Sequence, residues 1–191
     1  MKKYKIAIFA SGNGSNAEAI MNHFKGHPYI EVGALLTNNP NAYAIERARK
    51  MGVLCEVYTK QDFAGEKVSN RLSDLGFSHV CLAGYLLLVA EDLIKAFPDR
   101  IINIHPALLP KYGGKGMYGM KVHEAVKASG DTHTGITIHL VNSKYDEGKI
   151  VAQQTVEISP NDSPQDIANK VHELEHKYYP AVIEKWILTG N

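Results

Sequence analysis

Two polar side chains, Asn103 and His105, interrupt the apolar run formed by residues 101–110. They stand two positions apart, so in a β-strand they point to the same face. We expect that strand to be buried and to end near Pro106, which has no N–H to donate to a sheet. An amide donor beside an imidazole suits a reaction in which a carbonyl oxygen gains charge and a proton moves. The pair alone is equally compatible with a structural Asn and His, because buried polar groups are usually just hydrogen-bonded.

A second candidate site is the glycine-rich turn at residues 11–16, which directly follows the apolar run 5–10. Residues 17–24 have apolar positions at helical spacing, so the turn joins a predicted buried strand to the start of a helix. Free backbone N–H groups and the helix dipole make such a start an anion site. The turn matches neither Walker A nor G-x-G-x-x-G, and by itself it is also compatible with a plain tight turn.

The elements that position these residues alternate between strand and helix over the first hundred positions. We expect strands at 5–10, 29–36, 53–58, 79–83 and 101–105, and helices at 17–24, 42–51, 63–75 and 91–97. This alternation predicts an α/β fold with a Rossmann-like, mostly parallel central sheet and helices on both faces. Strands at 135–141 and 150–158 predict a C-terminal antiparallel hairpin. In the terminal helix at 164–188, Pro180 should cause a kink or break.

Three further segments leave their role open. The apolar run 84–88 is compatible with core, which it favours, or with the wall of a pocket for a flat ligand. Residues 111–120 contain four glycines and predict a mobile loop, either a lid or an ordinary connection. Asp146 lies in the hairpin turn, where an aspartate often makes only a local backbone bond.

Composition narrows the class of protein. The 191 residues fit one domain, and a formal net charge of +1 gives no basic field for nucleic acid. No run approaches the roughly 20 apolar residues of a membrane span. The nine histidines show no metal-ligand cluster, and Cys55 and Cys81 are expected to be buried free thiols. The N-terminal apolar run is too short for a signal peptide, so we expect a soluble cytoplasmic protein.

Together these motifs resemble the phosphoribosylglycinamide formyltransferase family, folate-dependent enzymes of purine biosynthesis, over nearly the whole chain. The resemblance rests on the 11–16 turn, on Glu46-Arg47-Ala48, on Asn103-Ile104-His105-Pro106-Ala107-Leu108-Leu109-Pro110-Lys111-Tyr112, on Gly135-Ile136-Thr137-Ile138-His139 and on Asp146-Glu147-Gly148. It implies transfer of a formyl group from 10-formyltetrahydrofolate, a co-substrate, to the glycyl amine of glycinamide ribonucleotide. It implies no metal and no nucleic-acid or membrane partner; a homodimer is compatible with the sequence. We expect one domain, 1–191, with a phosphate-binding half at 1–100 and a catalytic, folate-binding half at 101–191.

The resemblance also implies a role for each matching residue. Asn103 would donate to the formyl oxygen as its carbon becomes tetrahedral, protonated His105 would stabilise that charge, and Asp146 would hold His105, raise its pKa and take part in proton transfer. The ribonucleotide is expected at Gly12, Asn13, Gly14, Ser15, Asn16, His172 and Glu175. The folate is expected at Leu86, Leu87, Leu88, Val89, Asn103, Asn142, Ser143, Lys144, Tyr145 and Asp146.

The sequence departs from the family pattern at residues 86–89, where relatives carry an arginine, and at His172, where glutamine is common.

Three other classes of protein remain as alternatives. A formyltetrahydrofolate deformylase uses water as acceptor and normally has a regulatory domain before the first strand, which here begins near Lys5. Methionyl-tRNA formyltransferase needs a further RNA-binding domain and more basic charge. A non-catalytic nucleotide-binding module would not need Asn103, His105 and Asp146 together.

Overall fold

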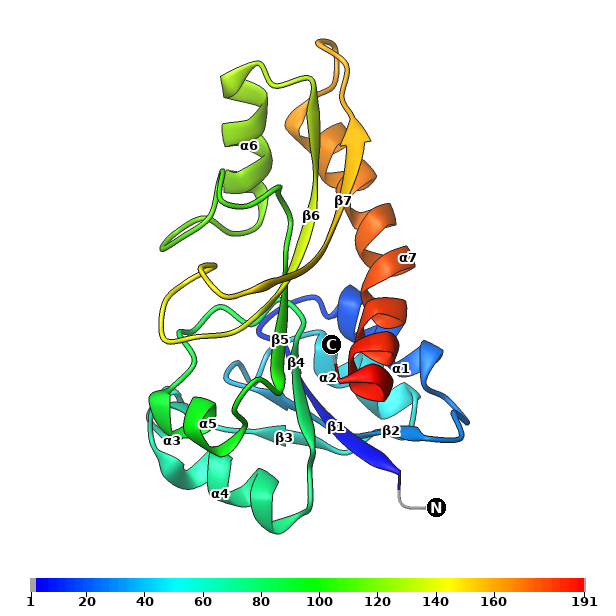
Figure 1. Ribbon diagram of the computed structural model, residues 1–191, viewed down its shortest axis with the longest axis vertical. Helices are drawn as coiled ribbons and strands as arrows, with labels where there is room; N and C mark the ends of the chain where they lie inside the picture. The colour runs from blue at the N-terminus through cyan, green and yellow to red at the C-terminus, as the bar shows by residue number, and fades with distance from the viewer. Residues whose placement is uncertain (1–2, 191) are drawn as a thin grey trace.

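A seven-stranded sheet runs through the computed structural model, which describes residues 3–190 (Figure 1). The strand order is β3-β2-β1-β4-β5-β6-β7. Strands β1 to β5 are parallel, and β6 and β7 run antiparallel to their neighbours, so the predicted α/β fold with a C-terminal antiparallel hairpin is confirmed. The strands are β1 Tyr4–Phe9, β2 Ile30–Thr37, β3 Cys55–Val57, β4 His79–Leu82, β5 Ile101–His105, β6 His133–Leu140 and β7 Ile150–Glu157.

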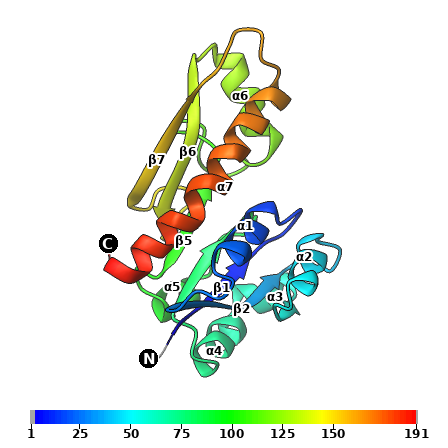
Figure 2. The ribbon, with the colours of Figure 1, turned by 90° about the vertical axis from the view of Figure 1, so that its right-hand side faces the viewer.

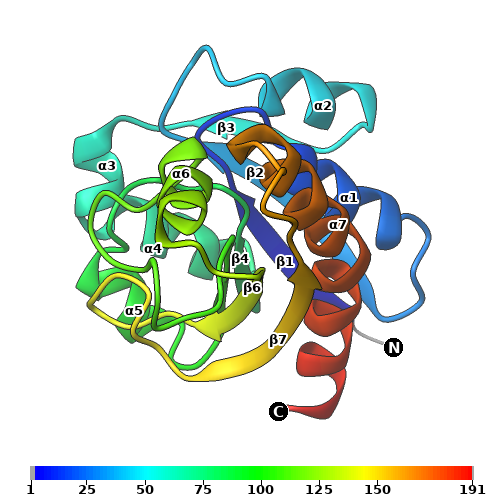
Figure 3. The ribbon, with the colours of Figure 1, turned by 90° about the horizontal axis from the view of Figure 1, so that it is seen from above.

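Helices cover both faces of the sheet (Figure 3). One group consists of α1 Ser15–His23, α2 Ala44–Lys50 and α7 Pro164–Thr189. The other group consists of α3 Lys60–Ala64, α4 Glu66–Asp74 and α5 Glu91–Ala96. Strands β6 and β7 extend beyond the parallel strands, where α6 Met120–Ser129 packs against α7 (Figure 2).

Strand β1 is apolar at consecutive positions because both of its faces are covered. Ile6 and Ile8 pack into the core cluster that includes residues of α1 and α7. Ala7 and Phe9 point the other way, into the cluster that includes residues of α4 and α5. All four side chains are fully buried, so the central strand anchors the turn that follows it.

The terminal helix α7 continues through Pro180, so of the kink or break predicted there the break is wrong. Pro180 is buried, and the preceding Tyr179 hydroxyl contacts the carbonyls of Leu82 at 2.8 Å and Ile102 at 3.1 Å. These contacts fix the helix on the sheet beside the position where proline removes a backbone bond. At the start of α7, Ser163 makes the N-cap that the sequence predicts.

Several predicted boundaries are also corrected. The helix expected at 63–75 is two helices, α3 and α4, and α3 begins at Lys60, where Thr59 makes a capping box. Strand β4 ends at Leu82, and the chain beyond it leaves the sheet. Cys81 is buried and Cys55 is half-buried, and both are free thiols. No helix within residues 3–190 combines the length and apolarity needed to span a membrane.

Candidate active site

A cavity of about 710 Å³ opens at the carboxyl ends of β1, β4 and β5, where open α/β sheets bind their ligands. Its walls come from the turn after β1, the segment after β4, the loop after β5, the β6–β7 turn and two helices, α6 and α7. All but one of the residues expected at the site line this cavity; the exception is Ser143. The lining members are Gly12, Asn13, Gly14, Ser15, Asn16, Leu86, Leu87, Leu88, Val89, Asn103, His105, Asn142, Lys144, Tyr145, Asp146, His172 and Glu175.

Four polar side chains form a continuous network at the centre of the cavity. Asn103 Nδ2 donates to His139 Nε2 at 3.1 Å. Asp146 lies beyond them, with Oδ1 3.6 Å from His139 Nε2 and Oδ2 3.5 Å from His105 Nδ1. The structure therefore brings together the three residues expected to be catalytic, and it adds His139.

The strand register explains why His139 joins the network. Antiparallel pairing of β5 with β6 places His139 directly opposite Asn103. His139 Nδ1 donates to the Leu140 carbonyl at 2.9 Å, so Nε2 is free to accept the Asn103 amide proton. The other N–H of that amide group remains to donate to a ligand. The partner of His139 could be known only from this register.

The loop after β5 holds the opposite end of the network. His105 Nε2 donates to the Tyr112 carbonyl oxygen at 2.7 Å. The Gly114 N–H donates to Asp146 Oδ2 at 2.9 Å. Asp146 itself has φ of 56°, a left-handed conformation that non-glycine residues rarely adopt and that is concentrated at functional sites.

Burial and neighbouring charges act in opposite directions on the pKa values of His105 and Asp146. His105 is 4% exposed, and its burial lowers its pKa by more than the Asp146 charge and the Tyr112 carbonyl raise it. The prediction of a raised His105 pKa is therefore wrong for the protein without ligands. Burial alone would raise the pKa of Asp146, but the neighbouring His139 and His105 side chains and the Gly114 N–H hold that pKa below its usual value. Burial therefore works against a positive charge on His105, while the neighbours of Asp146 favour its carboxylate.

The turn before α1 is shaped by a close approach between two helices. Gly14 has φ of 77°, and a Cβ added there would lie 2.5 Å from Ala44 Cβ in α2. Glycine is therefore required at this position for both conformation and space. Arg47 of α2 donates to the backbone carbonyl of Asn13 at 2.9 Å and to its side-chain oxygen at 3.0 Å. Asn16 Oδ1 is buried and has no hydrogen-bond partner within residues 3–190, which marks it as a candidate ligand contact.

The cavity also has a charged wall and an apolar wall. Glu175 of α7 is 4% exposed, lies 2.7 Å from His172 Nδ1, and raises the pKa of His172. His123 of α6, not predicted from the sequence, lines the same wall, and burial lowers its pKa to about 4. Leu86 and Leu88 are 47% and 46% exposed and form a pocket wall, whereas Tyr85 and Leu87 also pack against the core, so the run 84–88 serves both purposes. Among the described residues, no three His, Cys, Asp or Glu side chains are arranged to hold a metal ion.

Comparison with known proteins agrees with this geometry. Residues 4–183 match the formyl transferase family, and the chain therefore belongs to it. It is 36% identical to the phosphoribosylglycinamide formyltransferase of Bacillus subtilis, over 98% of this chain and 96% of the relative. It is 42% identical to the chloroplastic enzyme of that name from Arabidopsis thaliana, over 95% of this chain.

The solved structures give the same result. The phosphoribosylglycinamide formyltransferase of Bacillus halodurans has a TM-score of 0.86 and 34% identity, covering 98% of this chain and 97% of its own. The chain spans only 65% and 61% of the two plant relatives, from Arabidopsis thaliana and Vigna unguiculata. The resemblance to phosphoribosylglycinamide formyltransferases that the sequence predicts is confirmed.

Proposed function

We propose that this chain transfers the formyl group of 10-formyltetrahydrofolate to the glycyl amine of glycinamide ribonucleotide, a step of de novo purine (IMP) biosynthesis. The observation that carries the proposal is the network from Asn103 to His105, which lies in one cavity between a glycine-rich helix start and an apolar wall. The names of the relatives support the same reaction.

The two walls suit the two substrates. The first hydrogen bond of α1 runs from Glu18 N to Gly14 O. The N–H groups before Glu18 are therefore free at the start of the helix, which suits a phosphate. The buried carboxylate of Glu175 suits the hydroxyl and amine groups of the ribonucleotide. The exposed Leu86 and Leu88 side chains suit a flat folate ring. In a single domain of residues 1–191, the first half would then hold the phosphate and the second half would carry the catalytic residues.

The reaction forms a C–N bond between the amine nitrogen and the formyl carbon and breaks the bond from that carbon to folate N10. The second N–H of Asn103 donates to the formyl oxygen as it gains charge. His105 and Asp146 take up the proton that the amine loses, and a proton is returned to N10. Once protonated, His105 has donors on both nitrogens, facing Asp146 and the Tyr112 carbonyl.

The test is an assay with 10-formyltetrahydrofolate in the presence and absence of glycinamide ribonucleotide. We expect loss of the formyl group to depend on the ribonucleotide and to match the formylated product mole for mole. Equal loss without the ribonucleotide would instead identify a deformylase that uses water. Asn103→Ala should abolish transfer, whereas Asn169→Ala, at an exposed position of α7 outside the cavity, should leave it unchanged.

A further inference from the structure

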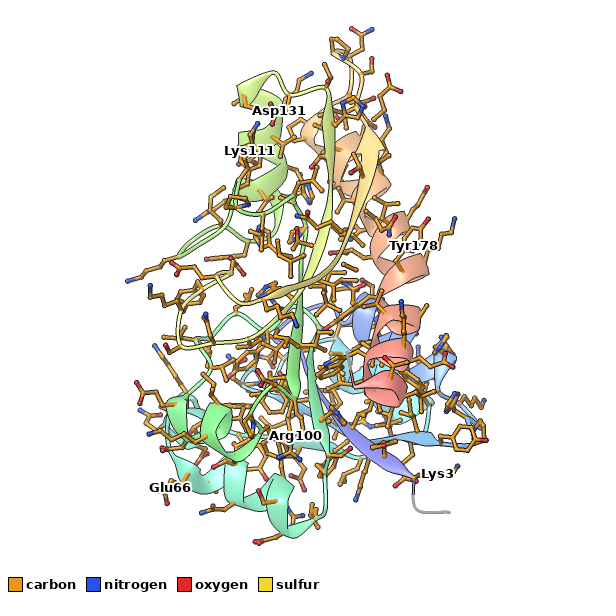
Figure 4. The ribbon with its side chains drawn as sticks, viewed as in Figure 1. Lys3, Glu66, Arg100, Lys111, Asp131 and Tyr178 are labelled. Carbon is orange, nitrogen blue, oxygen red and sulfur yellow. The ribbon has the colours of Figure 1, made fainter. Side chains whose placement is uncertain are left out.

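Ser11, the first residue of the turn before α1, also bonds the segment that follows β4. Its N–H donates to the Gly84 carbonyl at 3.0 Å, and its Oγ accepts the Leu86 N–H at 3.1 Å. In Figure 4, Lys3 marks the start of β1 and Arg100 the start of β5, so these bonds lie at the opposite, carboxyl ends of the strands. One residue therefore connects the turn expected to bind phosphate with the leucine run that forms the apolar wall.

The bonds of Ser11 continue the pairing between β1 and β4. The regular pairing of the two strands ends at Phe9 and Leu82. Beyond it, the backbone bond from Ser11 to Gly84 adds one step. At Leu86 the chain has left the sheet, and the acceptor for its N–H is the Ser11 side chain in place of a backbone carbonyl. The hydroxyl thus extends the pairing of the sheet to the residue where the leucine run begins.

The orientation of the Ser11 hydroxyl is fixed by Asn38, which follows β2. Ser11 Oγ donates its only proton to Asn38 Oδ1 at 2.6 Å, so a lone pair faces the Leu86 N–H. The Ser11 carbonyl accepts from Asn39 Nδ2 at 3.1 Å. Every polar group of Ser11 has a partner, and the residue is only 6% exposed. Ser11 is therefore held in one orientation, with an acceptor directed at the apolar wall.

The apolar wall depends on this backbone bond because its own side chains are only partly packed. Leu86 and Leu88 are exposed to the cavity, and only Leu87, between them, packs against the core. Gly84 has φ of 75°, a left-handed conformation at the point where the chain leaves the sheet. Removal of the Ser11 hydroxyl leaves the Leu86 N–H without its acceptor, so Leu86 can move while Leu87 keeps the segment attached.

We propose that Ser11 is a positioning residue for the folate, although it belongs to the turn expected to bind the ribonucleotide phosphate. Ser11 does not line the cavity, so it acts through the Leu86 backbone, which it holds in place. The role rests on the proposed formyl transfer, in which the apolar wall receives the folate ring. Loss of the hydroxyl weakens folate binding and leaves ribonucleotide binding nearly unchanged.

The test measures the Kd of tetrahydrofolate and of glycinamide ribonucleotide separately, by isothermal titration calorimetry on the full chain. We expect Ser11→Ala to raise the Kd of tetrahydrofolate about fivefold, and that of the ribonucleotide less than twofold. Asn38→Ala should raise the Kd of tetrahydrofolate by a smaller factor, and Asn38→Asp, which keeps an acceptor oxygen, should restore it. Ser69→Ala is the matched control, because this buried hydroxyl donates to the Glu66 carbonyl at 2.9 Å outside the cavity.

Steady-state kinetics should show the same division, with KM for 10-formyltetrahydrofolate raised and KM for the ribonucleotide nearly unchanged. Hydrogen exchange of the Leu86 amide, without any ligand, reports the contact itself. We expect it to be faster in Ser11→Ala than in the wild type and in Ser69→Ala.

Each outcome decides the proposal. Equal increases in both Kd values, or a larger increase for the ribonucleotide, overturn it, because Ser11 would then only shape the phosphate turn. An unchanged Kd for tetrahydrofolate also overturns it. If Ser11→Ala does not fold, Asn38→Ala, compared with Asn38→Asp, carries the test. A wild type that binds no tetrahydrofolate overturns the proposed function and the role of Ser11 together, and this result differs from a wild type whose folate affinity the variants leave unchanged.

Discussion

Replacing Asp146 by Asn removes the charge of the catalytic network while keeping the shape of the side chain. The side chain is 11% exposed, and an Asn oxygen can still accept the Gly114 N–H. A lost charge-assisted hydrogen bond costs about 1–2 kcal/mol, and a buried amide needs less desolvation than a buried carboxylate. We therefore expect the free energy of unfolding to fall by only about 1 kcal/mol.

The effect of Asp146→Asn on catalysis should be much larger. At the 3.5 Å separation of Asp146 Oδ2 and His105 Nδ1, a unit charge pair in a medium of dielectric constant near 20 is worth about 5 kcal/mol. If the transition state realises between half and all of the positive charge on His105, kcat falls about 70- to 5,000-fold. Because Asp146 raises the His105 pKa, its removal should lower that pKa further.

The assay is kcat at saturating substrates, with the His105 titration followed by NMR in the same samples. Glu147→Gln is the matched control, because this neighbouring carboxylate is 59% exposed and pairs with Lys144. We expect the control to retain wild-type kcat and His105 titration. A kcat for Asp146→Asn within about threefold of wild type, with an unmoved His105 titration, would refute the role given to Asp146.

Three further predictions concern the phosphate-binding turn, the glycine-rich loop and the buried His123. A Cβ at Gly12 would meet no atom within 4 Å, so Gly12→Ala should leave the fold intact. In steady-state kinetics it should raise KM for the ribonucleotide far more than KM for the folate. Equal changes in the two KM values would count against phosphate binding there. Limited proteolysis should cut the exposed part of the loop, residues 115–119, and both substrates together should slow the cut; cleavage at the same rate with and without them would show that the loop does not close over ligands. Burial lowers the pKa of His123 from 6.5 to about 4, so as the pH is lowered the unfolded chain takes up this proton before the folded chain does. The free energy of unfolding should therefore fall as the pH is lowered from 6.5 to 4. This loss is at most about 3 kcal/mol and can be measured by denaturant unfolding at a series of pH values. In His123→Gln the free energy of unfolding should change less over the same pH range.

The sequence predicts the fold well where the signal is local. Consecutive apolar positions in β1 identify a strand covered on both faces, and the two-residue spacing of Asn103 and His105 puts them on one face. Both inferences depend only on the period of a strand and need no knowledge of its neighbours. The break predicted at Pro180 is wrong because it considers only the local backbone bond that proline removes. The contacts that hold α7 on the sheet beside Pro180 come from Leu82 and Ile102, which are far away in the sequence.

The residues that the sequence did not reveal are those defined by their neighbours. His139 enters the network through the pairing of β5 with β6, and a shift of one residue would turn it to the opposite face. Tyr112 contacts His105 through its backbone carbonyl, which every residue has, so the sequence gives no signal for this contact. Leu86 and Leu88 have the composition of core residues, and only the cavity beside them makes them a wall.

The pKa of His105 shows that predicting the right partner does not by itself give the right direction of a pKa shift. Asp146 lies where the family resemblance implies, and it does raise the His105 pKa. The sequence gives the identity of that partner but not how deeply the pair is buried. His105 is only 4% exposed, and its burial lowers the pKa by more than the Asp146 charge raises it. Burial and the Asp146 charge therefore act on the His105 pKa in opposite directions, and only the structure shows that burial has the larger effect.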